Sequence, residues 1–239
     1  MDTKPSDFFV LGASPFIGDY VVLGVCPTGK TFSKLIIGDN AIIRSHSVIY
    51  AGTKIGNDFQ TGHGVLIREG NTIGDNVSIG SHTVIERENR IGNATRIHSN
   101  CFIPEFVNIE EKVWIGPCVT ILNILHPPCP RFEDCAKSVH IKKNAKIGGN
   151  VTIGPRVTIG QNSLIGMGSV VTVDIPDNVL AFGNPARVIK PITQLTCELD
   201  YFQILMNGRD SNEGFFKQDV CGRPNTKGRL ECFKQRAVY

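Results

Sequence analysis

The chain has 239 residues and a formal net charge of +3, from 25 lysines and arginines against 22 aspartates and glutamates. That length can bury one good core with a small appendage, and the weak charge, without any basic run, argues against a nucleic-acid partner. The polar residues 1–7 and the lack of a membrane-length apolar stretch favour a cytoplasmic protein with no membrane partner. In that compartment the eight cysteines are expected to be reduced thiols or metal ligands.

Residues 1–34 precede any regular pattern, and we expect a short N-terminal β cap there. After residue 34, an isoleucine or a substitute for it recurs at nearly every sixth position. The series runs from Ile37 to Ile121, stops, and resumes from Ile141 to Val171. A period of six fits neither an amphipathic helix nor an alternating strand, so it indicates internal repeats.

The residues after each isoleucine predict corners. Glycine follows many of the isoleucines, and Asn or Asp often comes within two further residues, as in Gly38-Asp39-Asn40. These residue types tolerate positive φ, so each hexad is predicted to be a short strand followed by a tight corner. Three hexads close a triangular coil of about 18 residues, and coils stack at roughly the 4.8 Å spacing of parallel strands. Residues 35–191 are therefore expected to form an all-β parallel β-helix of about seven coils.

The repeat has one large break, which we call the corner loop (residues 122–140). An insertion at the corner of a closed coil must project outward, and long excursions from a compact scaffold are usually functional. The loop carries His126, Cys129 and Cys135. Beyond the last coil, residues 192–239 lose the repeat, and we expect a C-terminal extension there, either a solvated tail or an appendage that contacts other subunits.

The 18-residue coil also predicts which residues stack. Arg87, Glu105 and Asn123 are spaced by 18 and should form one column beside the corner loop. Neighbours in such a column lie about 5 Å apart, so Glu105 and Asn123 could hold one small polar group between them. The alternative is an outward-facing corner pair that serves only solubility or subunit contact.

Two sets of segments carry a resemblance to known enzymes. VWIGPCVTILNILHP (113–127), with the hexads after the loop and the GNPAR element at 183–187, resembles the catalytic half of hexapeptide-repeat sugar acetyltransferases. FQTGHGVLIRE (59–69) and RIHSNCFIPE (96–105) are similar, more narrowly, to N-acetyltransferases of nucleotide-linked amino sugars. The resemblance implies a left-handed parallel β-helix, a homotrimer, and transfer of acetyl from acetyl-CoA to the amine of a nucleotide-linked aminodeoxysugar.

The resemblance also implies roles for residues near the corner loop. Glu105 and Asn123 would orient the amine, with Glu105 favouring loss of its proton. His126 matches the catalytic histidine of sugar O-acetyltransferases and would act as a general base. The other readings of His126 are a ligand to a structural zinc with Cys129 and Cys135, which excludes a free base, or loop packing. With His126 as base, the alternative function is a sugar or small-molecule O-acetyltransferase.

Further residues are predicted to bind the two substrates. His63, His98, Arg68 and Arg87 would contact the acceptor, and His63 is the strongest of them because it lies in the family-like Thr-Gly-His-Gly segment. On the donor side, glycines would permit close approach of the pantetheine arm and two cations suit its phosphates, although solvated surface cations are the alternative. These donor-side residues are Gly148, Gly166, Gly168, Arg187 and Lys190.

Two readings from other classes remain open. One is a zinc enzyme in which His63, His82 and His98 bind metal between subunits, although none of them is close to another in sequence. The other is a non-catalytic β-helical scaffold, which would bind no acetyl-CoA. Fold alone cannot exclude a scaffold, so the enzyme prediction depends on the corner loop and on the column beside it.

Overall fold

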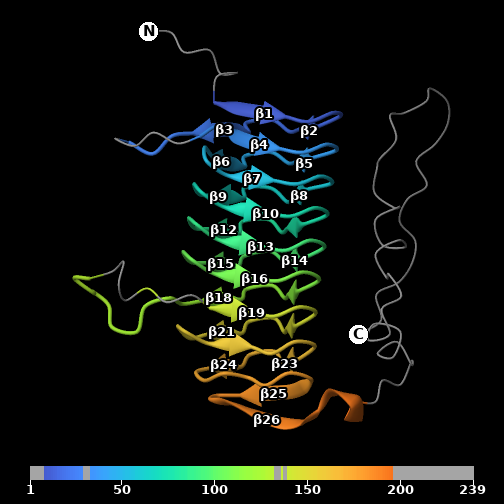
Figure 1. Ribbon diagram of the computed structural model, residues 1–239, viewed down its shortest axis with the longest axis vertical. Coiled ribbons are helices and arrows are strands. Elements are labelled where there is room, and N and C mark those ends of the chain that lie inside the picture. The colour runs from blue at the N-terminus through green and yellow to red at the C-terminus, as the bar shows by residue number, and fades with distance from the viewer. Residues whose placement is uncertain (1–7, 29–32, 132–135, 137–138, 196–239) are drawn as a thin grey trace, which may run out of the picture. The chain divides into compact units, whose positions relative to one another are not determined.

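The computed structural model describes residues 8–28, 33–131, 136 and 139–195. Three parallel sheets form the faces of a triangular prism, in which successive strands pass from one sheet to the next and each coil stacks below the one before it (Figure 1). We call the sheets A, B and C, and name the corners by the sheets that they join. In the described part of the chain no helix is long and apolar enough to cross a membrane.

Almost every strand is short, because each hexad supplies only two or three extended residues. Sheet A consists of β1 (Phe9–Leu11), β4 (Leu35–Ile37), β7 (Lys54–Ile55), β10 (Thr72–Ile73), β13 (Arg90–Ile91), β16 (Asn108–Ile109), β19 (His140–Ile141) and β22 (Thr158–Ile159). Sheet B consists of β2 (Phe16–Ile17), β5 (Ile42–Ile43), β8 (Gln60–Thr61), β11 (Ser78–Ile79), β14 (Arg96–Ile97), β17 (Trp114–Ile115), β20 (Lys146–Ile147), β23 (Leu164–Ile165), β25 (Val179–Gly183) and β26 (Ala186–Pro191). Sheet C consists of β3 (Val22–Val25), β6 (Val48–Tyr50), β9 (Leu66–Ile67), β12 (Val84–Ile85), β15 (Phe102–Ile103), β18 (Thr120–Ile121), β21 (Thr152–Ile153) and β24 (Val170–Val171).

The register of the strands confirms the 18-residue coil. Ile73 of β10 pairs with Ile91 of β13, and Ile85 of β12 pairs with Ile103 of β15. The pairing continues across the corner loop, where Ile109 of β16 pairs directly with Ile141 of β19. The loop is therefore an insertion at the corner between sheets C and A, and the stack closes beneath it.

The core consists of one ladder of inward side chains on each sheet. Nearly all the isoleucines of the six-residue series are fully buried, whereas the residue before each of them faces outward or is only half-buried. Within β4, for example, Ile37 is 1% exposed and its neighbour Ile36 is 44% exposed. Small or branched residues at the corners, such as Val77 and Val119, fill the space between the ladders.

The helix begins one coil earlier than the isoleucine series predicts. Strands β1, β2 and β3 pair in parallel with β4, β5 and β6, so these first strands form a complete coil on top of the seven coils from β4 to β24. The other end is closed by the antiparallel hairpin β25–β26 and by the 3-10 helix η2 (Ile192–Gln194). The rest of the C-terminal extension, residues 196–239, lies outside the described residues.

Glycine follows the inward isoleucine because the next coil leaves no room for a side chain. A Cβ placed on Gly80 would lie 2.3 Å from the backbone nitrogen of Ser99 and 2.4 Å from the carbonyl carbon of His98. Real Cβ atoms are not found that close to backbone atoms, so the coils would have to separate. The glycines at these positions therefore set the spacing of the stack.

We expect Gly80→Ala to destabilise the protein by about 1–3 kcal/mol, the usual cost of forcing extra atoms into a packed site. Gly154 is the matched control, because it also follows an inward isoleucine but its added Cβ would meet nothing closer than 3.2 Å. The midpoint of urea unfolding should fall clearly for Gly80→Ala and little for Gly154→Ala. Equal midpoints would contradict the steric explanation.

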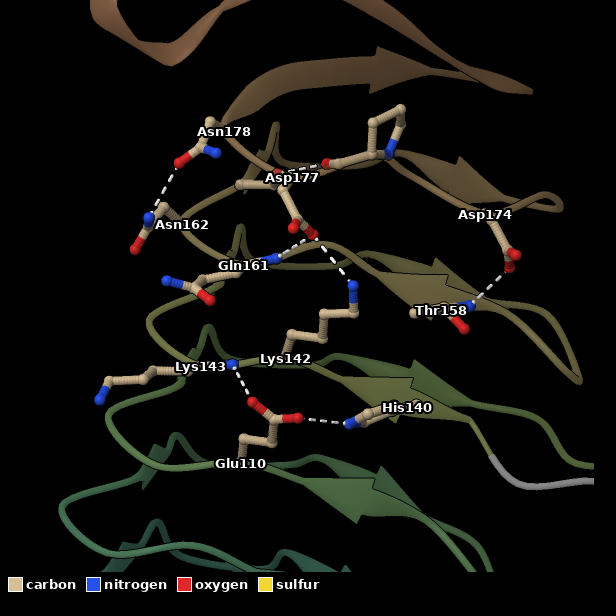
Figure 2. Close-up of polar contacts among 12 residues, drawn as sticks. Glu110, His140, Lys142, Lys143, Thr158, Gln161, Asn162, Asp174, Asp177 and Asn178 are labelled. Carbon is tan, nitrogen blue, oxygen red and sulfur yellow. Dashed lines mark hydrogen bonds and ion pairs between the residues drawn. The ribbon is translucent and has the colours of Figure 1, made fainter.

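Polar side chains hydrogen-bond the first coil after the corner loop to the neighbouring coils. Glu110 stands after Ile109, where most coils have glycine, and its carboxylate accepts a 2.8 Å hydrogen bond from the backbone N–H of Lys143. The other carboxylate oxygen lies 2.7 Å from Nε2 of His140 (Figure 2). Further along, Asp177 accepts a hydrogen bond from the backbone of Gln161 and pairs with Lys142 at 3.2 Å. These contacts hold the chain in register where it re-enters the helix.

Candidate functional site

The corner between sheets C and A departs most from the repeat. In five successive coils the residue after the inward isoleucine is not glycine: it is Tyr50, Arg68, Glu86, Pro104 and Leu122 in turn. The corner loop leaves the helix at the last of these coils. Charged side chains and the one long insertion therefore meet at the same edge of the prism, which makes this edge the candidate site.

Glu105 and Asn123 are in direct contact at this corner. The side-chain amide of Asn123 donates a 2.9 Å hydrogen bond to Oε2 of Glu105, and it lies 3.4 Å from the backbone oxygen of the same residue. Asn123 is 8% exposed and Glu105 is half-buried. The sequence predicts a stacked pair with room for a group between the two side chains, but the two side chains together bridge the gap between coils. The amide therefore orients the carboxylate, and a ligand held by both side chains stays a prediction.

Arg68 is bound by its own neighbours. Its guanidinium makes two hydrogen bonds to the carboxylate of Glu69, at 2.9 and 3.2 Å, and a third contact of 3.3 Å to Glu86. The same guanidinium lies 5.1 Å from the ring centre of Tyr50, and Glu69 is only 3% exposed. Arg68 therefore neutralises a buried carboxylate, and its predicted contact with substrate would have to compete with these bonds.

Glu86 is the residue at this corner that the sequence analysis missed. Burial raises the pKa of the Glu86 carboxyl above the ordinary 4.5, and the charges of Glu105 and Glu69 raise it further, against the opposing charges of Arg68 and Arg87. Three carboxylates thus lie near two guanidiniums. An 18-residue step from Arg68 leads to Glu86, so the coil spacing contained the signal.

Arg87 and Phe106 form the outer part of the corner. The Arg87 guanidinium lies 5.1 Å from the centre of the Phe106 ring, close enough for a cation–π interaction with the aromatic face. Phe106 has a φ of 66°, the left-handed corner conformation that Glu88 has one coil earlier, at 60°, so this backbone angle belongs to the repeat.

His126 lies three residues beyond Asn123, in the corner loop, where its side chain is exposed. Cys129 is a half-buried free thiol, and Cys135 lies outside the described residues. Among the residues that the structure describes, no three His, Cys, Asp or Glu side chains are close enough to hold a metal ion. A zinc site in the loop therefore stays a prediction, as does the role of His126 as a base.

The predicted substrate residues His63 and His98 lie at a different corner, between sheets B and C. The Nδ1 atom of His63 is 2.9 Å from the hydroxyl of Ser45, in the coil above. His98 packs its ring against Trp114, with ring centres 4.7 Å apart. His82 is exposed on the same edge. Within one chain, strands of sheet C separate these histidines from Glu105 and Asn123, so the chain alone does not bring the two groups together.

The residues predicted to bind the donor lie in the late coils and the closing hairpin. An added Cβ would clash with the next coil at Gly148, at 2.5 Å from Met167, and with the Phe182 side chain at Gly166, at 2.7 Å, so both glycines are already required by packing. Gly168 differs, because its φ is 70° and nothing lies within 4 Å of an added Cβ. The two cations lie on β26, where Arg187 is exposed and Lys190 is half-exposed. Arg187 donates a hydrogen bond to the backbone oxygen of Ala186, and Lys190 donates one to the backbone oxygen of Gln194.

The six-residue series agrees with a known repeat family. The family model "Bacterial transferase hexapeptide (six repeats)" matches residues 52–87 and 138–172, which lie on either side of the corner loop. No curated protein sequence matches the chain significantly.

Solved structures add evidence on the fold. LpxA, a UDP-N-acetylglucosamine acyltransferase from Bacteroides fragilis 9343, is similar at a TM-score of 0.64 and 19% identity, over 87% of this chain and 76% of that one. The hexapeptide-repeat acetyltransferase VCA0836 from Vibrio cholerae is 32% identical over 44% of this chain, with a TM-score of 0.40. PerB from Caulobacter crescentus, solved with CoA and GDP-perosamine, is 26% identical over 63% of this chain, with a TM-score of 0.42.

The chain matches 62% of the length of the Vibrio cholerae acetyltransferase and 57% of that of PerB, which is less than two thirds of each. The LpxA match extends over most of both chains and therefore supports the β-helical fold. The family match and the parallel register of the three sheets agree with that fold. Parts of the chain on both sides of the corner loop match the bacterial transferase hexapeptide model, and the fold is the left-handed parallel β-helix that the resemblance implies.

Proposed function

We propose that this protein is an acetyl-CoA-dependent N-acetyltransferase that acts, as a homotrimer, on the amine of a nucleotide-linked aminodeoxysugar. The observation that carries the proposal is the hydrogen bond between Asn123 and Glu105 at the base of the corner loop. The match to a transferase repeat on both sides of that loop supports a group-transfer reaction. The charges at the corner between sheets C and A support an amine as the acceptor.

An amine is protonated near neutral pH, and this corner suits a cation. Glu69 and Glu86 share Arg68, while the second carboxylate oxygen of Glu105 accepts no hydrogen bond from the described residues. Asn123 fixes the Glu105 carboxylate in one orientation, so its free oxygen can accept a hydrogen bond from the ammonium group. The pair thus binds the acceptor through the group that reacts.

The reaction follows from loss of that ammonium proton. Glu105 accepts the proton from the bound ammonium, directly or by way of water, and the free amine attacks the thioester carbonyl carbon of acetyl-CoA. The nitrogen–carbon bond forms, the carbon–sulfur bond breaks, and the sulfur leaves as a thiolate that takes up a proton. A main-chain amide would stabilise the oxyanion that forms on the way. On the donor side, we propose that the open surface at Gly168 admits the pantetheine arm and that Arg187 and Lys190 bind phosphate.

A thiol-release assay tests this proposal against O-acetylation. Purified protein is given acetyl-CoA with nucleotide amino sugars, or with the same nucleotide sugars carrying a hydroxyl in place of the amine. We expect CoA release only with the amines, and we expect His126→Ala to retain most of that activity because a deprotonated amine needs no strong base. Release with hydroxyl acceptors that His126→Ala abolishes would favour an O-acetyltransferase, and no release with either class would favour a scaffold.

The raised pKa of Glu86 predicts how activity changes with pH. As pH falls, Glu86 takes up a proton above its ordinary pKa of 4.5, so the corner loses one negative charge. We expect the Michaelis constant for the amine to rise in that range. In Glu86→Gln the charge is absent at every pH, so the Michaelis constant should be higher near neutrality and this early rise should vanish. A pH series of initial rates measures both, and unchanged profiles would contradict a role for Glu86.

A further inference from the structure

Sheet B carries two cations on either side of the protein's one tryptophan. Arg96 on β14 pairs with Trp114 on β17, and Trp114 pairs with Lys146 on β20. His98 lies two residues after Arg96, with its ring against the indole at 4.7 Å. We call these four residues the sheet-B patch. It lies on a different face of the prism from Glu105 and Asn123, and the proposed reaction does not use it.

The charge of Lys146 is not balanced by any residue that the structure describes. Its side chain is half-buried, and among the described residues it makes no hydrogen bond or ion pair. Burial lowers the pKa of the Lys146 ammonium group, and no carboxylate in the described part of the chain offsets that effect. A partly buried cation without a counter-charge is unfavourable in the free protein, and a bound anion would remove the cost.

His98 adds a second unsatisfied group on the same surface. Its Nε2 atom is buried and has no hydrogen-bond partner within the described ranges of the chain, which is rare for a buried polar atom. Burial and the charge of Arg96 both lower the pKa of the imidazole, so the ring is neutral near pH 7. The patch thus offers one more hydrogen-bonding group beside its cations.

The position of His98 in the repeat is itself unusual. It follows the inward Ile97. At the same corner most of the other coils, with Arg44 as an exception, have glycine at this position: Gly62, Gly80, Gly116, Gly148 and Gly166. Those glycines are required where the next coil would meet a Cβ. A histidine there departs from the packing rule without gaining a hydrogen bond in return. Departures of this kind are expected at binding sites rather than in a scaffold.

We propose that the sheet-B patch binds a nucleoside diphosphate group. The indole of Trp114 would stack on the base, as aromatic side chains do with any nucleobase. Arg96 and Lys146 lie one coil to either side, roughly 5 Å along the ladder, so phosphates attached to that base would reach a cation. The inference rests on the proposed function, because both proposed substrates contain this group: the sugar nucleotide and CoA.

Tryptophan fluorescence tests binding directly, since Trp114 is the sole tryptophan. The full-length protein is titrated separately with UDP and with CoA. We expect at least one of them to quench the emission. We expect Lys146→Met to raise the dissociation constant of that ligand about tenfold, the effect of losing one charge-assisted hydrogen bond. Lys54→Met is the matched control, because Lys54 also precedes an inward isoleucine but lies exposed on sheet A, and it should bind like the wild type.

Steady-state kinetics identify the source of the group. A rise in the Michaelis constant of Lys146→Met for the sugar nucleotide assigns the patch to the acceptor, and a rise for acetyl-CoA assigns it to the donor. Both results support the inference. If acetyl transfer occurs but Lys146→Met changes neither constant nor either titration, the inference is wrong while the proposed function stands. Binding of UDP or CoA at the patch without any acetyl transfer would support the inference and contradict the proposed function.

The competing occupant is a carboxylate of a second copy of the chain. In that case Lys146→Met would change the molar mass measured by light scattering, and the affinity for UDP and CoA would equal that of the wild type. That pair of results would overturn the inference. A quenching titration that is saturable in the wild type, weaker in Lys146→Met and independent of protein concentration would support nucleotide binding instead.

Discussion

Replacing Glu105 with glutamine should lower kcat/KM for the amine acceptor by about a hundredfold, a typical loss when a group that moves a proton is removed. Glutamine keeps the size of the side chain but carries no charge and cannot accept the ammonium proton. The hydrogen bond from Asn123 shows that the carboxylate is held in one orientation, so water is a poor substitute for it. Initial rates of CoA release over a range of acceptor concentrations measure the effect.

Two comparisons make this result specific. Glu111→Gln removes a carboxylate at another corner, where Glu111 pairs with Lys143, and should leave kcat/KM unchanged. Asn123→Ala should also lower kcat/KM, but combined with Glu105→Gln it should add little, because the amide acts through the carboxylate. Full additivity of the two substitutions, or wild-type activity in Glu105→Gln, would show that the pair does not act as one unit.

Ile37→Ala should destabilise the protein by about 2–5 kcal/mol, the range measured for removing a large buried aliphatic side chain. Ile37 is fully buried, and its backbone pairs with Ile55 of the next coil. Because the ladder hydrogen bonds fix the distance between coils, the neighbours cannot move far to fill the cavity. Urea unfolding followed by circular dichroism measures the loss.

Ile36 provides a control within the same strand. It is the same residue type, one position earlier, and it points outward with 44% of its surface exposed. Ile36→Ala should change the free energy of unfolding by less than about 1 kcal/mol, as surface substitutions do. Equal losses for the two variants would contradict the inward and outward assignment, and with it the phase of the whole repeat.

The regular part of the fold could be predicted because each hexad repeats the same physical solution. The positions of the isoleucines indicated the strands, the corners and the 18-residue coil, and the structure confirms all three. The first coil was predicted only as a β cap, because its residues are out of phase with the main series. Leu11, Ile17 and Leu23 keep the six-residue step among themselves and pair with Ile37, Ile43 and Ile49, but the segment after β3 places them 26 residues from their partners instead of 18.

The candidate site was predictable to the level of backbone position but not of side-chain contact. Coil spacing brought Glu105 and Asn123 together, and the structure has them within hydrogen-bonding distance. The coil spacing could not reveal that Arg68 is bound to Glu69 and Glu86, because ion pairing depends on side-chain direction. Similarly, the sequence alone did not indicate that packing against the next coil already requires glycine at positions 148 and 166.

The most direct test of the central claim is to identify the product and the atom that carries the acetyl group. The wild-type protein and Glu105→Gln are incubated with acetyl-CoA and a nucleotide-linked amino sugar, and the product is examined by mass spectrometry and NMR. Our account predicts one added acetyl group, bound to nitrogen and stable to mild base, formed by the wild type and about a hundredfold more slowly by Glu105→Gln. A base-labile ester, or an amide formed equally fast by both proteins, would contradict it.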